Sequence, residues 1–174
     1  NNKDNEKILS EWHYLLIREL VVLPDFEPTG EYISEKLQKL IKPHEGEKAL
    51  RFLIEAGFLK EESGRWKILD PVLDTGDTIF TDELIKKYHS QNLKIWSENL
   101  NLWKSKGLEM GLLNLSLPAS KIPELKEKMR NFQDHILGWL QNEPAAHSVV
   151  QIGVYRIPHS VAETSTRRDT RRRS

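Results

Sequence analysis

Basic side chains recur between residues 44 and 67, where the sequence has the pattern of a helix followed by a hairpin. Lysine and arginine are the side chains that contact phosphate oxygens and base edges in complexes with nucleic acid. The pattern therefore predicts contact with duplex DNA. The candidate residues are His44, Lys48 and Arg51 on the outward face of the predicted helix, and Lys60, Arg65 and Lys67 on the predicted hairpin.

Acidic residues in the same region oppose this prediction. Glu45 and Glu47 stand at the front of the predicted helix, and residues 1–70 contain eleven Lys and Arg against fourteen Asp and Glu. Negative charge near phosphates opposes the release of counterions that supplies most of the affinity for DNA. A protein-interaction module that uses the acidic face for docking is therefore a second hypothesis.

The C-terminal tail is basic. Five arginines stand among Ser and Thr at the end of the sequence: Arg167, Arg168, Arg171, Arg172 and Arg173. Such a run cannot bury apolar surface, so we expect it to be disordered. It is a candidate to bind phosphates of nucleic acid, an acidic partner, anionic lipid or a cyclic dinucleotide, and the alternative is a solvated charged end.

The sequence lacks the motifs of common enzymes. It has no phosphate-binding glycine loop, Gly-x-Ser-x-Gly elbow, His-Glu-x-x-His or calcium loop, and no cysteine. Its histidines include no pair four residues apart, so a helical metal site is not indicated. We expect no enzyme activity, no metal and no cofactor. His13 and His89, which lie among aromatic residues, are expected to be partly buried and hydrogen-bonded, with Asp74 or Thr75 as conceivable partners.

The N-terminal elements that position the basic residues can be read from periodicity. An apolar stripe from Ile8 to Leu23 predicts one helix that ends at Pro24, and a second follows over residues 32–41. After Lys42 and Pro43, a third helix is expected from His44 to Ala56, with Gly57 as its left-handed cap. Residues 58–69 then read as strand, Ser-Gly turn and strand. This order is that of a winged helix-turn-helix, which we assign to residues 6–70.

The C-terminal half begins with a connection that leads to a long helix. Thr81 is the expected N-cap of a helix that keeps its apolar spacing to Gly107, so residues 71–107 form the connecting segment. Residues 112–117 and 150–155 alternate apolar and polar side chains, and a helix capped by Ser120 lies between them. We therefore expect a β-α-β unit over residues 108–158. Because two strands make a thin sheet, we expect further strands from the connection or a second chain, and hence a homodimer.

Several phrases together resemble a known family of bacterial proteins. They are WHYLLIREL at Trp12–Leu20, LIEAGFLKEESGRWKIL around the hairpin, DTGD at Asp74–Asp77, YHSQNL at Tyr88–Leu93 and VVQIGVYRI near the end. Over residues 8–157 the chain resembles an uncharacterised winged-helix, regulator-like family that is common in predatory bacteria. The resemblance implies the fold, a transcriptional role and a further N-terminal region, and it carries over no catalytic residue. Members end in an apolar Phe-Pro-Leu-like segment, whereas this chain reads Ile157, Pro158, His159 and continues into the tail.

The predicted fold class is α+β: a winged helix-turn-helix, a long connecting helix, a small β-α-β unit and a disordered basic tail over residues 159–174. The leading hypothesis is a transcriptional regulator that binds duplex DNA as a dimer, and the alternative is a non-catalytic protein-interaction module. No apolar run reaches the roughly 18 residues of a membrane span and residues 1–10 are polar, so we expect a cytoplasmic protein without a membrane span.

Overall fold

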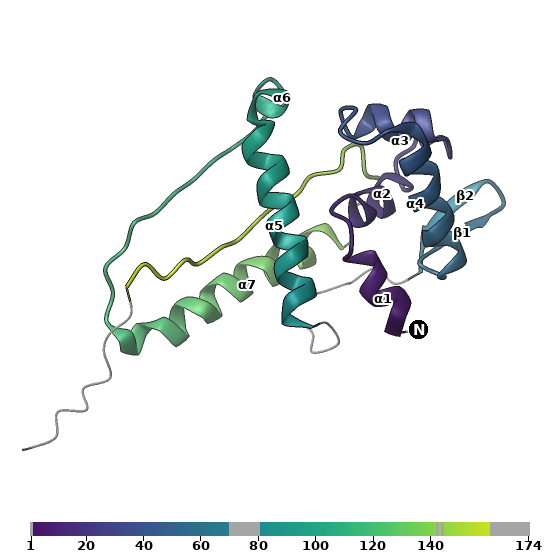
Figure 1. Ribbon diagram of the computed structural model, residues 1–174. Helices are drawn as coiled ribbons and strands as arrows, with labels where there is room; N and C mark the ends of the chain where they lie inside the picture. The colour runs from purple at the N-terminus through teal and green to yellow at the C-terminus, as the bar shows by residue number, and fades with distance from the viewer. Residues whose placement is uncertain (1, 70–80, 142, 144, 161–174) are drawn as a thin grey trace, which may run out of the picture. The chain divides into compact units, whose positions relative to one another are not determined.

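The computed structural model describes residues 2–69, 81–141, 143 and 145–160 (Figure 1). The chain forms two compact units, one of Asn1–Met110 with Pro144–Val150 and the other of Gly111–Glu143 with Gln151–Ser174. Helices and a small two-stranded sheet make the fold α+β, in agreement with the predicted class. Residues 70–80, which include the start of the predicted connection, and the arginines of the tail lie outside the described residues. No helix in the described ranges is long and apolar enough to cross a membrane.

The first unit begins with two short helices, and the helix predicted over residues 8–23 is shorter than expected. α1 spans Asn2–Ile8 and α2 spans Tyr14–Leu20. The turn between them is held at Ser10, whose backbone N–H and hydroxyl both donate to the carbonyl oxygen of Lys7, at 3.0 and 2.7 Å. Ser competes for local backbone groups in this way and breaks helices. The apolar spacing continues across the turn because both helices face the same core.

Two further helices pack closely through glycine. α3 spans Gly30–Lys36 and begins at Thr29, whose hydroxyl accepts from the N–H of Tyr32 at 3.2 Å. α4 spans Pro43–Glu55. A Cβ atom at Gly30 would lie 2.1 Å from the carbonyl oxygen of Pro43, so no larger residue fits where the two helices begin. Between the helices the backbone of Gln38 and Lys39 is left-handed, with φ of 58° and 60°.

The helix α4 and the hairpin follow the predicted pattern. Gly57 has φ of 79°, and the N–H groups of Gly57 and Phe58 donate to the carbonyls of Ile54 and Leu53, which is the Schellman cap. β1 (Leu59–Glu62) and β2 (Arg65–Ile68) pair antiparallel. They are joined by Ser63 and Gly64, both with positive φ, as a two-residue hairpin turn requires.

The core of the first unit lies between α1 to α4 and the hairpin. Ile8, Leu9, Ile17, Ile33 and Leu53 are the largest side chains that are fully buried. The ring of Phe52 packs at 5.3 Å from that of Tyr14 and at 6.2 Å from that of Phe58. Figure 1 shows α2, α3 and α4 gathered together, with the hairpin following the C-terminal end of α4.

The long helix is shorter than predicted. Thr81 is its N-cap as expected, because its hydroxyl accepts from the N–H of Leu84 at 3.3 Å. α5 spans Asp82–Glu98 and is followed, after a break at Asn99, by α6 over Leu100–Lys104. At the break the side-chain amide of Asn99 donates to the carbonyl of Ile95 at 2.9 Å, a local bond that competes with helix propagation.

A glutamine on α5 fastens this helix to the N-terminal turn. The side-chain oxygen of Gln91 accepts from the backbone N–H of Trp12 at 2.8 Å, and its amide donates to the carbonyl of Ser10 at 3.1 Å. Tyr88 and Asn92 are buried beside it. Gln91 thus satisfies both a donor and an acceptor of the turn between α1 and α2.

The second unit corrects the predicted β-α-β arrangement. Its helix is confirmed as α7, Ile122–Leu140, although Ser120 lies in a 3-10 turn (Ala119–Lys121) and Lys121 precedes the helix. Residues 112–117 and 150–155 contain no strand in the part of the chain that is described. Alternation of side chains makes these segments competent for strand pairing, but a strand also needs a hydrogen-bonding neighbour.

We expect Gln91→Ala to lower the free energy of unfolding by about 1–3 kcal/mol, because it leaves two partly buried backbone groups without partners. Chemical denaturation followed by circular dichroism measures the change. Lys87→Ala, an exposed position on the same helix, is the matched control and should change stability by less than about 0.5 kcal/mol. Equal stability of the two variants would show that Gln91 does not fasten α5.

Candidate nucleic-acid interface

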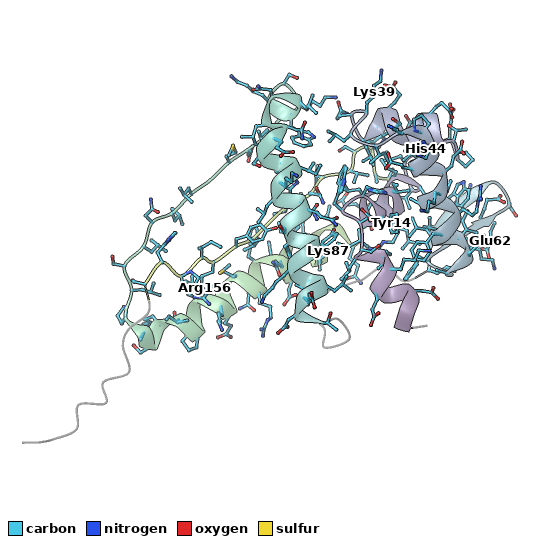
Figure 2. All side chains as sticks on the ribbon, in the orientation of Figure 1. Tyr14, Lys39, His44, Glu62, Lys87 and Arg156 are labelled. Carbon is cyan, nitrogen blue, oxygen red and sulfur yellow. The ribbon has the colours of Figure 1, made fainter. Side chains whose placement is uncertain are left out.

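The outward face of α4 carries the three residues predicted on the helix. His44, Lys48 and Arg51 are all exposed. The opposite face buries Ala49, Leu50, Phe52 and Leu53 in the core. Figure 2 labels His44 near the start of the helix. Because one face of α4 is fixed by packing, the other presents these side chains to solvent from a rigid element.

Glu45, one of the two acids that opposed DNA binding, is engaged within its own helix. Its carboxylate accepts from the backbone N–H of Lys42 at 2.7 Å, as the N3 glutamate of a capping box does. Its charge also lies at the positive end of the helix dipole. The acids that remain on the exposed face of α4 are Glu47 and Glu55.

On the hairpin, two of the predicted lysines share one carboxylate. Lys60 and Lys67 pair across the strands, and their ammonium groups lie 2.7 and 2.6 Å from the oxygens of Glu62. The hydrogen bonds from Lys60 and then Lys67 lower the pKa of Glu62 to about 2. Figure 2 labels Glu62 on the hairpin. This carboxylate therefore stays charged at neutral pH and offsets part of the positive charge of the hairpin.

Arg65 completes the set of predicted cations. It is exposed at the start of β2 and, like Lys48 and Arg51, makes no ion pair with any residue that the structure describes. Glu62, its partner in the strand register, is occupied by the two lysines, and Glu61 accepts from the backbone N–H of Gly64 at 2.6 Å. Three arginine and lysine side chains are thus available to an external anion.

Charge is unevenly distributed within residues 1–70. Residues 42–68, which hold α4 and the hairpin, contain six Lys and Arg against five Glu, whereas the remaining residues contain five against nine. Three of the five glutamates, Glu45, Glu61 and Glu62, are held by the intramolecular contacts described above. The acidic balance of the region therefore resides mainly outside α4 and the hairpin.

The aromatic residues beside the hairpin do not form an exposed patch. The ring of Phe26 packs edge-on against Tyr32 at 5.4 Å and against Trp66 at 5.6 Å, and all three are partly buried against the core. Tyr32 also donates its hydroxyl to Asp25 at 3.2 Å. These rings support the base of the hairpin, so they offer little apolar surface to a protein partner.

His13 is more deeply buried than its sequence context predicts. It lies between the rings of Trp12 and Tyr14, and its Nδ1 atom has no hydrogen-bond partner among the described residues. Burial lowers the pKa of His13 to about 4, and the charge of Glu45 opposes part of that shift. Burial also lowers the pKa of the half-buried His89. Asp74 and Thr75, the expected partners of these histidines, lie outside the described residues.

Three residues with structural roles, Gln91, Glu62 and Glu45, are not predicted from the sequence. Gln91 binds two backbone groups that are distant in sequence, and Glu62 binds Lys60 on its own strand and Lys67 on the other. Neither residue stands out by type or spacing. The capping role of Glu45 could have been found, because a glutamate at the third helical position is a known N-terminal signal.

A family model described as "Domain of unknown function (DUF4423)" matches residues 1–157. No curated protein and no solved structure matches the chain significantly.

We expect the free energy of unfolding to fall as the pH falls from 6.5 towards 4. The pKa of His13 is lower in the folded chain than its ordinary value of 6.5, so the unfolded chain binds the proton more readily. The full difference is worth about 3 kcal/mol and is complete below pH 4. Denaturation curves at stepped pH measure it.

His13→Leu and His13→Asn should both flatten this dependence, the second while keeping a polar side chain, and His89 accounts for some residual slope. A slope between pH 6.5 and 4 that neither variant reduces would contradict the assignment to His13.

Proposed function

We propose that this chain, which belongs to the family described as "Domain of unknown function (DUF4423)", is a transcriptional regulator that binds duplex DNA through a winged helix. In this proposal α4 is the recognition helix and the β1-β2 hairpin is the wing. The cations that contact DNA are Lys48, Arg51 and Arg65, together with His44, Lys60 and Lys67.

The order of the elements supports the winged helix. α2, α3 and α4 follow one another, α3 and α4 are joined by a tight turn, and a two-stranded hairpin follows directly after the cap of α4. In winged helix-turn-helix proteins the third helix enters the major groove and the wing reaches the adjacent backbone. α4 has 13 residues, enough to present more than one turn to the groove.

The observation that carries the proposal is the exposed cationic set on one rigid helix and its hairpin. Lys48, Arg51 and Arg65 have no ion pair among the described residues, so binding a phosphate does not first require breaking one. The glutamate that preceded them in the helix, Glu45, is occupied at the helix start. Glu47 and Glu55 remain exposed beside them and should keep the affinity of a single copy modest.

The alternative is a non-catalytic docking module that uses the same face for a protein partner. It is favoured by the exposed side chain of Ile54, which lies on α4 between Arg51 and Glu55. The aromatic rings of Tyr32 and Trp66 would be the natural anchors of such an interface, but they are partly buried. DNA binding therefore remains the better-supported function.

Reversing the charge of both helix cations should remove DNA binding without unfolding the protein. Lys48→Glu with Arg51→Glu is expected to weaken binding to a random-sequence duplex by about a hundredfold or more at low salt, because both side chains are exposed and become repulsive. Fluorescence anisotropy measures the affinity.

The matched control is Lys86→Glu with Lys94→Glu, which makes the same change of charge at exposed positions of α5. An equal loss in both double variants would assign the effect to overall charge and not to α4. Unchanged binding in the α4 variant would exclude the helix as the reader.

Neutralising Glu62 should strengthen DNA binding. Glu62→Gln releases Lys60 and Lys67 from their shared carboxylate, so both become available to phosphates. We expect a several-fold higher affinity and a steeper dependence on salt, by about one unit in the logarithmic slope for each additional contact. Little stability is lost, because exposed ion pairs contribute little.

The control is Glu98→Gln on α5, which removes a carboxylate 4.0 Å from Lys94. If Glu62→Gln changes neither affinity nor salt slope relative to Glu98→Gln, the hairpin does not touch DNA.

A further inference from the structure

The second unit exposes far more apolar surface than it covers. No residue of α7 is buried, and Trp139 and Phe132 on this helix are 65% and 48% exposed. In the segment before the helix, Leu112 and Leu113 are 85% and 81% exposed. Ile157, in the segment after it, is 65% exposed. Surface loops are usually polar, so these apolar segments differ from loops that stay in contact with water.

The amount of exposed apolar area is sufficient for an interface. Summed over α7 and the segments that flank it, the exposed apolar side chains present on the order of 1,000 Å². A stable complex covers roughly 800 Å² on each partner. The unit therefore holds enough exposed apolar area for a stable dimer.

The backbone before α7 also has unused hydrogen-bonding groups in the part of the chain that is described. Residues 111–117 have no backbone hydrogen bond to any part of the chain that the structure describes, and they run as coil in Figure 1. Their alternating side chains fit a strand, with Leu113 and Leu115 on one side and Asn114 and Ser116 on the other. Charged residues usually protect a free strand edge from pairing with another chain. This segment contains none.

We propose that a second copy of this chain covers α7 and pairs with residues 111–117 as a strand. The described residues of the second unit contain five Lys and Arg against four Asp and Glu, so two copies meet without appreciable repulsion. This near-neutral, apolar surface does not suit nucleic acid or an acidic partner. Two copies bring the same strand-competent segments and the same apolar helix, which is what a two-fold interface needs.

This dimer does not depend on DNA binding, since its residues lie in the second unit and the cations lie in the first. It does change what DNA binding achieves, because two copies present two α4 helices to one duplex, and linked contacts multiply a modest affinity.

Light scattering coupled to size exclusion tests self-association, and hydrogen exchange followed by mass spectrometry tests strand pairing. We expect a dimer at micromolar concentration, with the amides of residues 112–117 protected in the dimer and exchanging freely after dilution to the monomer. A monomer at all accessible concentrations overturns the proposal. So does a dimer whose 112–117 amides exchange freely, or protection that persists on dilution, which would mean pairing within one chain.

Leu113→Glu with Leu115→Glu should weaken self-association by about a hundredfold or more, because two charges would enter a buried apolar contact. The matched control is Leu108→Glu with Met110→Glu, two exposed apolar residues at the end of the first unit. A dimer that survives the first pair, or is lost equally with the second, refutes the assigned surface. The dilution experiment needs no substitution, so it decides the question even if a variant fails to fold.

Discussion

The close approach of α3 and α4 at Gly30 and Pro43 is the constraint on which the first unit depends. A Cβ atom at Gly30 would stand 2.1 Å from the carbonyl oxygen of Pro43, so the two helices can begin this close only because that residue is glycine. The chain must then reverse within six residues, and the left-handed backbone of Gln38 and Lys39 accomplishes this. With α3 fixed in this way, Ile33 and Leu53 close the core, and α4 has one defined outward face. The proposed interface is that face.

Local chemistry explains which elements the sequence predicts well. Thr81, Gly57 and the Ser63-Gly64 turn act through backbone groups a few residues away, and each was located correctly from the residue types alone. The apolar stripe over residues 8–23 predicts one continuous helix, whereas α1 ends at Ile8 and α2 begins only at Tyr14, because the apolar period reports a common core and not an unbroken backbone. Asn99 likewise interrupts a helix whose apolar spacing continues beyond it.

Contacts between distant residues limited the rest of the prediction. The two hydrogen bonds of Gln91 each join residues about eighty positions apart, and no pattern in either segment predicts them. The strand pattern at residues 112–117 specifies which side chains share a face, but not which backbone supplies the hydrogen bonds. For the candidate interface, the sequence predicted the outward cations on α4, whereas the pairing of Lys60 and Lys67 with Glu62 required the hairpin register.

The two units expose different kinds of groups that could bind a partner. The first is well packed and leaves cations without ion pairs on α4 and the hairpin, while the second leaves apolar side chains and strand-competent backbone uncovered. Charged groups in water are stable as they stand, whereas exposed apolar surface favours association. In the proposed account the second unit therefore joins two copies, and the first reads the duplex.

The most direct test of the account is an amide chemical-shift map of the isotope-labelled protein titrated with a duplex DNA at low and at physiological salt. Binding through α4 and the hairpin should give salt-sensitive shifts concentrated in residues 43–55 and 59–68, with α5 and α7 largely unaffected. Shifts confined to other elements, or none at low salt, would contradict the claim that α4 and the hairpin form a DNA-binding surface.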